Sequence, residues 1–406
     1  MNPFQAASNT KNQTTRKHTA MTFSKHPVWA MAFRPLYSLT AIYGAISVLL
    51  WGFGYQGTSA LPGFFWHAHE MIWGYAGGVV VAFLLTAVAT WTKQPPVGGG
   101  RLILLVSCWL LARLFSFIPQ TALLSGLCGT AFYWLAAYYM GQSVFAAKSS
   151  RNYIAVAALV LMGITVAAFH TALYMGNSAN LQQNLFAGLV MVAGFIGLIG
   201  SRIIAFFTSR RLNTPQPASP QWALVAPLAL PMLMAALMTA RAALPVAALC
   251  GIACGILGLV QTVRWWAKGT AKEPLLWTLH AGYAATALGL IVMGIGQWQP
   301  QLMSAGVHFV AVGGIGMLTV SMMTRTALGH TGRNLYPAPK PMPTAFLLML
   351  AALLVRVLAA VMLYVNQTGY QHSLRLSAVL FAASLLIYAW RYTPWLLRPR
   401  LDGKPG

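Results

Sequence analysis

Acidic residues are almost absent from this chain of 406 residues. Only three Asp and Glu occur, against 26 Lys and Arg, which gives a formal net charge of +23. Charged residues make up 7% of the sequence, where soluble proteins have about a quarter, and hydrophobic residues make up 58%. No soluble core needs so much apolar surface. The composition therefore excludes an ordinary soluble domain and indicates an integral membrane protein.

Cysteine is scarce as well, and its placement argues against a disulfide framework. The four cysteines all fall in apolar runs: Cys108, Cys128, Cys250 and Cys254. Cys250 and Cys254 are four positions apart and would share a helix face, where thiolate ligation is one interpretation. We favour burial as small apolar side chains, because free cysteine is among the residue types most often buried.

Long apolar runs take the place of charge in this sequence. Each is long enough for a helix to cross the ~30 Å hydrocarbon layer of a membrane. A lone segment in lipid must satisfy its backbone groups internally, so each run is expected to be helical. Twelve runs lie near residues 36–54, 67–91, 102–118, 121–140, 153–174, 182–207, 221–239, 242–264, 275–295, 303–327, 343–365 and 373–391.

These runs predict an all-α fold class, a polytopic membrane helix bundle of about 12 transmembrane helices. We expect residues 1–33 to form a disordered or amphipathic cytoplasmic arm, 34–392 the membrane domain and 393–406 a cytoplasmic tail. The basic start of the chain lacks the apolar core of a cleavable signal peptide. No separate soluble domain is expected, and a division into two six-helix halves near 208–220 stays open.

The basic residues orient the bundle. Arg241 and Arg375 fall on one side of the expected spans, Arg113 and Arg356 fall within spans, and all other Lys and Arg fall on the opposite side. This asymmetry predicts that both termini are cytoplasmic. It also argues against nucleic acid as a partner, because the positive charge is spread along a membrane face and forms no groove-sized patch.

Ionisable side chains within the spans are the functional candidates, because they are costly to bury in lipid. The stretch "FFWHAHEMIWG" at 64–74 places His67, His69 and Glu70 near the external end of the second span. On a helix His67 and Glu70 share a side, while His69 is turned by about 200° from His67. Either the two imidazoles serve different sites, or His67 belongs to the entering loop.

Four further histidines extend this pattern. His170 and His308 lie toward the external side, while His280 and His330 lie toward the cytoplasmic side. Imidazole is a common ligand of heme iron and copper, although hydrogen bonding across helices is the interpretation we favour for His170. A continuous helix would hold His308 and His330 about 33 Å apart. Separate external and cytoplasmic clusters are therefore expected, unless "VGGIGM" at 312–317 breaks the helix.

Four blocks of sequence resemble the NnrS family. They are "FRPLYSLTAIYG" at 33–44, "WHAHEMIWGYAGGVVVAFLLTAVATWT" at 66–92, "GLIGSRIIAFFT" at 197–208 and "HFVAVGGIGMLTVSMMTRTALGHTGR" at 308–333. The resemblance implies a protein of the bacterial cytoplasmic membrane, linked to nitric oxide metabolism and nitrosative stress. Heme b, and copper as a second metal, are the cofactors it implies. The residues that match the family blocks are His67, His69, His280, His308, His330, Arg202, Arg325 and Arg333.

These matches lead to a specific site hypothesis. We expect His67 and His69 to ligate iron or copper at the external side, with His308 as the partner and His170 as a further candidate ligand. Glu70, on the His67 side, would orient an imidazole or donate protons. Arg202, Arg325 and Arg333 would hold heme propionates. The alternative for these arginines is a purely topological role.

Three functions from different classes remain open. The first is an oxidoreductase that binds nitric oxide and reduces it with electrons from quinol. The second is a heme or metal protein that binds nitric oxide without turnover, as a sensor or scavenger. The third is a transporter of a small solute, in which Arg113 and Arg356 pair with an anion. We favour a heme protein, because many histidines with few acids fit cofactor ligation better than ion coupling.

Overall fold

The computed structural model describes residues 23–403 and is a bundle of long helices. In this part of the chain no strand forms, and one isolated bridge joins Gly57 and Pro62. The twelve passes are α1 (Phe33–Gly52), α2–η3–α3 (Gly63–His69, Glu70–Ala76, Gly77–Thr92), α4 (Gly99–Phe115), α5 (Ala122–Ala146), α6 (Tyr153–Tyr174), α7 (Ser178–Leu212), α8 (Gln221–Ala240), α9 (Leu244–Trp265), α10 (Pro274–Ile295), α11–η8–α12 (Met303–His308, Phe309–Gly316, Met317–His330), α13 (Pro341–Val365) and α14 (Gln367–Leu396).

The all-α membrane bundle predicted from the sequence is confirmed. Ten of the passes are long and apolar enough to cross a membrane, and the shorter α4 and its neighbour α5 complete the set. Several helices extend past the expected runs: the last begins at Gln367 where 373 was expected, and α5 ends at Ala146 where 140 was expected. Hydropathy marks the part of a helix that lies in lipid, and polar residues continue the same helix beyond it.

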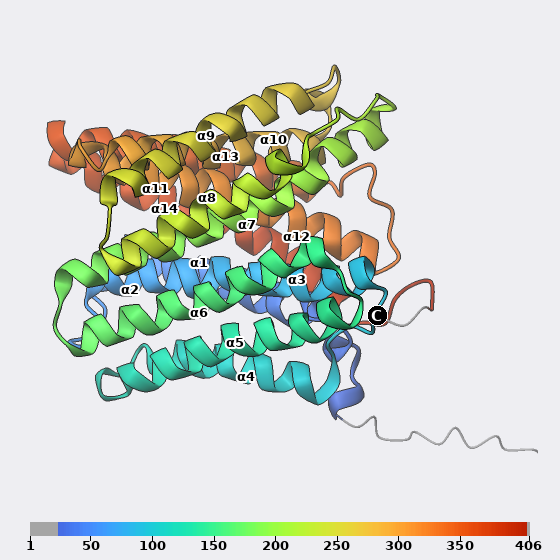
Figure 1. Cartoon of the computed structure of the whole chain (residues 1–406), viewed down its shortest axis with the longest axis horizontal. Helices are drawn as coiled ribbons and strands as arrows, with labels where there is room; N and C mark the ends of the chain where they lie inside the picture. The colour runs from blue at the N-terminus through green and yellow to red at the C-terminus, as the bar shows by residue number, and fades with distance from the viewer. Residues whose placement is uncertain (1–22, 404–406) are drawn as a thin grey trace, which may run out of the picture.

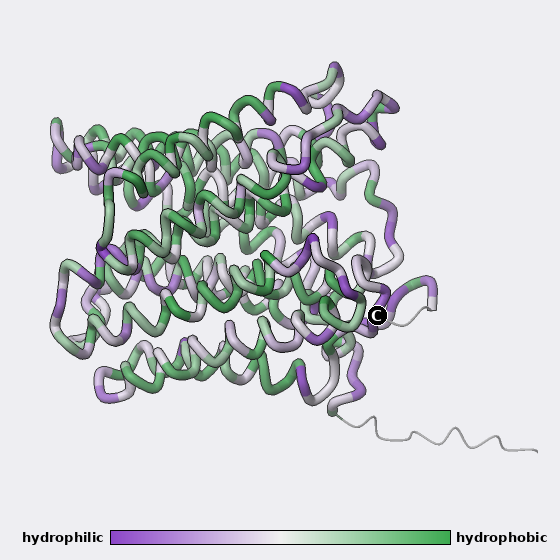
Figure 2. Tube along the Cα trace, viewed as in Figure 1, coloured by the Kyte–Doolittle hydropathy of each residue, from purple (hydrophilic) through white to green (hydrophobic). Residues whose placement is uncertain are grey.

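The passes run side by side, so that the connections gather at the two ends of the bundle (Figure 1). The first described residues and the C-terminal end lie at the same end. Figure 2 shows apolar residues along the middle of the helices and hydrophilic residues concentrated at the ends. This banding is the pattern expected of helices whose middle faces a hydrocarbon layer.

Four passes form the interior of the bundle. The most apolar 18-residue stretch is 83% buried in the Gly63–Thr92 pass and 72% buried in α7. The corresponding stretches of α8 and of α13 are only 39% buried. The other two inner passes are α10 and Pro300–His330. Because α7 packs against both η3 and η8, it joins the pass that carries His67 and His69 to the pass that carries His308. Further packing of α7 against α8 and of α1 against α14 makes one continuous bundle.

The pass with His67 and His69 and the pass with His308 both change from α to π geometry. The sequence left open a break at 312–317, which η8 overlaps, but gave no such signal for η3. The π segment η3 begins directly after His69, and η8 begins directly after His308. Tyr133 on α5 donates a hydrogen bond to the Trp73 carbonyl (2.8 Å), and Trp109 on α4 donates to the Gly74 carbonyl (2.8 Å). Neighbouring helices thus satisfy backbone groups of η3, where regular α-helical bonding is interrupted.

The two ends of the described chain are tied to the bundle. Short 3-10 turns at Phe23–Lys25 and Pro27–Trp29 lead into α1, and the Trp29 side chain packs against the core. The remainder of the expected arm, residues 1–22, lies outside the described residues. At the other end, Arg34 donates hydrogen bonds to the carbonyls of Leu396 (2.9 Å) and Arg398 (2.7 Å). The four cysteines are free, as expected.

Candidate metal and cofactor centres

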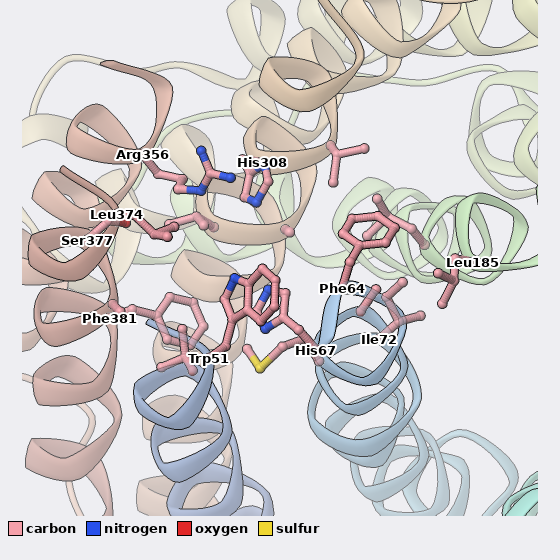
Figure 3. A pocket seen from close by; sticks show the side chains of 18 of the residues that line it. Trp51, Phe64, His67, Ile72, Leu185, His308, Arg356, Leu374, Ser377 and Phe381 are labelled. Carbon is pink, nitrogen blue, oxygen red and sulfur yellow. The ribbon is translucent and has the colours of Figure 1, made fainter. Parts of the chain in front are cut away.

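An apolar cavity lies between α1, α2, α7, α11, α13 and α14. The empty space here, about 850 Å³, is partly open to the surroundings. His67 and His308 both line it, and Arg356 contributes a guanidinium (Figure 3). Most other lining side chains are apolar, including Trp51, Phe64, Met71, Leu185, Phe186 and Phe381. A largely apolar lining with a few polar side chains is typical of a small-molecule site.

The backbone fixes the tautomer of His308. Its Nδ1 atom lies 2.7 Å from the carbonyl oxygen of Ser304, one turn earlier in the same pass. A carbonyl oxygen only accepts hydrogen bonds, so Nδ1 must carry the proton and Nε2 keeps its lone pair. Figure 3 shows the ring pointing toward the stacked Trp51 and His67 side chains. The geometry prepares Nε2 of His308 as a donor atom.

An aromatic stack holds His67 in place. The rings of Trp51 and His67 are 5.0 Å apart between centroids and tilted by only 13°. Nδ1 of His67 is buried and has no hydrogen-bond partner among the described residues. A buried imidazole nitrogen without a partner is costly unless a ligand satisfies it. His67 therefore offers a second donor at this cavity.

A second centre lies on another side of the same pass. His69 Nε2 faces His170 Nε2 on α6 at 3.0 Å, and His69 Nδ1 lies 2.7 Å from Glu70 Oε1. All three side chains are buried. A carboxylate at Nδ1 puts the proton there and leaves the Nε2 lone pair for a partner. In the structure that partner is the other imidazole, so one proton is shared between two nitrogens that could each bind a metal.

Glu70 belongs to this second centre, which corrects the expectation that it lies on the His67 side. Its Oε2 atom accepts a hydrogen bond from Tyr43 (2.6 Å) and pairs with Arg113 (3.0 Å). A regular α-helix over 67–74 would put Glu70 on the His67 side, whereas the π segment begins at Glu70. Direct bonding to the adjacent His69 and the pull of Arg113 turn the carboxylate away from the cavity.

His170 also reaches a groove on the outer face of α5 and α6. Apolar and aromatic side chains line this groove, among them Leu123, Leu127, Trp134 and Tyr174. A Cβ atom on Gly126 would collide with the His170 ring, so glycine is what allows α5 to pack closely here. The second centre is therefore connected to the apolar surface of the bundle.

The structure does not bring the cytoplasmic candidates together in one site. His280 bonds Thr208 Oγ1 through Nε2 (2.9 Å), whereas the His330 ring packs against Phe33. Within residues 23–403, no group of three His, Cys, Asp or Glu side chains is arranged to hold a metal ion. The His67–His308 cavity and the His69–His170 centre instead each offer a pair of imidazoles.

The three arginines proposed for heme propionates already have protein partners. Arg202 donates to Asn152 Oδ1 (2.7 Å), and Arg325 donates to Tyr336 (2.9 Å). Arg333 lies over the ring of Trp395 at 4.1 Å. Burial, followed by repulsion from Arg391 and Arg398, lowers the pKa of Arg333. Their role toward a propionate stays a prediction.

The family model described as NnrS protein matches residues 27–400, nearly the whole chain. The chain belongs to the NnrS family. This confirms the resemblance seen in the four sequence blocks. It also identifies a membrane protein associated with the response to nitric oxide. A search of the curated proteins finds no match.

For this NnrS-family chain, the sequence pointed to the histidines but missed several side chains that hold them. Nothing in the sequence marks Trp51, Tyr43 or the Ser304 carbonyl as partners of the site residues, because aromatic and small polar residues are common at such positions in membrane helices. Arg113 and Arg356 did stand out as charges within spans. The structure gives them different surroundings: one is paired with Glu70, and the other faces the cavity.

Proposed function

We propose that this protein binds heme b in the cavity lined by His67 and His308, and that it binds nitric oxide there. The observation that carries the proposal is that two imidazoles from distant passes line one apolar cavity. The unpartnered nitrogen of His67 and the free Nε2 of His308 fit a group that takes imidazole ligands. When bound, ferrous heme would supply the metal to which nitric oxide binds.

The chain's own residues would orient the two histidines and exclude water from the cavity. Trp51 keeps the His67 ring in one plane, and the Ser304 carbonyl holds the His308 tautomer that can ligate. The apolar walls exclude water yet admit nitric oxide, which is small and uncharged. The protein would lie in the bacterial cytoplasmic membrane.

We further propose that copper, if present, is held by His69 and His170. Imidazole suits copper, and the carboxylate of Glu70 at the far nitrogen of His69 is the usual arrangement behind a metal-bound histidine. An ion would replace the proton that the two Nε2 atoms now share. Glu70 would orient His69 in this arrangement.

Turnover requires a donor of electrons and protons. Reduction of two nitric oxide molecules to nitrous oxide and water consumes two electrons and two protons, and oxidation of one quinol to quinone releases the same number of each. The groove that reaches His170 gives a lipid-soluble quinol an approach to the second centre. Glu70 and His69 would then carry protons inward from that side.

An optical spectrum of the purified, reduced protein before and after nitric oxide tests the heme proposal. Heme bands that shift with nitric oxide are expected. His67→Ala and His308→Ala should each reduce heme content or change its bands, whereas His280→Ala, at the other end of the bundle, should not. A colourless, iron-free protein would sink the proposal and favour transport. Continuous consumption of nitric oxide with quinol would indicate an enzyme, and uptake that stops at saturation a sensor or scavenger.

A further inference from the structure

Arg356 is a buried cation at the cavity wall. It lies within the α13 pass, and only 9% of it is exposed. Its Nη1 atom is buried and makes no hydrogen bond within the described residues. Figure 3 shows the guanidinium beside His308, among the side chains that line the cavity. A buried guanidinium without an anionic partner is unfavourable, above all in a membrane.

The chain has no acidic side chain to spare for Arg356. The sequence contains three acidic residues, and each already belongs to an ion pair: Glu70 with Arg113, Glu273 with Arg211, and Asp402 with Arg400. The negative charge that would stabilise Arg356 therefore has to come from a bound molecule.

The cavity also defines the rest of that molecule. Apart from Arg356, its polar lining is limited to His67, His308, Ser377 and the indole of Trp51. The remaining wall is aliphatic and aromatic, so a small inorganic anion would leave most of this surface without a partner. A ligand with a large apolar body and one anionic group would satisfy both the apolar wall and the Arg356 guanidinium. Carboxylate suits the guanidinium best, because the two can form paired hydrogen bonds.

We propose that Arg356 binds the carboxylate of an apolar ligand in this cavity, and that this carboxylate is a propionate of heme b. The identity of the ligand rests on the proposed function, whereas the anionic site rests on Arg356 itself. Arg356 is thereby distinguished from Arg202, Arg325 and Arg333, whose guanidinium groups contact protein partners. It would anchor the cofactor at the same end of the bundle as His67 and His308.

Titration of heme-free, full-length protein with heme b and with its dimethyl ester tests the site. The ester keeps the apolar ring and the iron but has no free carboxylate. Wild-type protein should bind heme b about tenfold or more tightly than the ester. In Arg356→Gln this ratio should fall close to one. Arg375→Gln is the matched control, because it removes an exposed arginine on the next helix, α14, and should keep the wild-type ratio.

Arg356→Met provides a second variant, since an apolar side chain of similar length avoids a buried, half-satisfied amide. Circular dichroism and gel filtration establish that each variant is folded. An unchanged preference for heme b over the ester in either folded Arg356 variant would overturn the proposal.

A second binding experiment distinguishes failure of the heme assignment from failure of the anionic site. If wild-type protein binds neither form of heme, oleate and methyl oleate are compared in the same variants. Preference for oleate that disappears in Arg356→Gln would support the carboxylate site with a lipid as the source. Equal binding of the two, or no binding of either, would overturn it.

Discussion

Glu70 shows how one buried acid organises several neighbours. Its two oxygens contact His69, Tyr43 and Arg113. Removal of one partner of a buried ion pair leaves the other charge without compensation. The carboxylate therefore stabilises the fold of the second centre as well as the orientation of His69.

We expect Glu70→Gln to destabilise the protein by about 3 kcal/mol, because Arg113 then lies buried without a counter-charge. Thermal unfolding in detergent would measure this loss. Glu273→Gln is the matched control: its pair with Arg211 is partly exposed at the bundle end, and surface pairs contribute about 0–1 kcal/mol. Equal losses of stability in the two variants would contradict the role assigned to Glu70.

The His69–His170 pair leads to a prediction about metal content. If copper binds there, His69→Ala and His170→Ala should each lower the copper content of the purified protein to near background, because one imidazole alone is a weak site. Elemental analysis provides the measurement. His280→Ala removes a buried histidine elsewhere and should keep the wild-type copper content. Retention of copper in both pair variants would mean that copper binds at another place.

At the scale of elements, the two π segments decide where the histidine side chains point. Each begins right after a histidine, and each belongs to an interior pass. Tyr75 of η3 and Thr319 of α12 are hydrogen-bonded, which joins the two passes directly. π segments are rare and are frequently found at functional sites, so their position here agrees with the two candidate centres.

Gly77 tests the packing around η3. A Cβ atom at this position would collide with the Tyr133 hydroxyl, which otherwise donates to the Trp73 carbonyl. We expect Gly77→Ala to cost about 1–3 kcal/mol of stability, because overpacking displaces Tyr133 and leaves a carbonyl unsatisfied. Gly100→Ala is the control, since nothing lies within 4 Å of the added atom. A Gly77→Ala protein that unfolds at the wild-type temperature would show that Tyr133 moves freely.

At the scale of the whole molecule, the sidedness of the bundle follows from its positive charge. We predict that both termini are cytoplasmic, because nearly all Lys and Arg fall in the two terminal segments and the alternate connections expected on the same side. Reporter fusions after residues 60 and 300 should report the external side, and a fusion after residue 215 the cytoplasm. A cytoplasmic signal at 60 or 300 would refute this topology, together with the external position assigned to both centres.

The sequence by itself determined the class of fold, the number of passes and their approximate bounds. The membrane sets the length of each apolar segment and the side on which Lys and Arg gather. Both features depend on consecutive residues, so they can be recognised along the sequence. It also indicated that His67 and His69 point in different directions, since that follows from helix geometry alone.

Only the tertiary structure decided which side chains meet. His69 faces His170 from a distant helix, His67 shares a cavity with His308, and Glu70 turns toward Arg113. The physical reason is that lipid-facing and buried faces of a membrane helix are both apolar, so hydropathy does not reveal how a helix is rotated about its axis. Each π segment then shifts that rotation within its own pass, and η3 receives hydrogen bonds from the neighbouring helices α4 and α5.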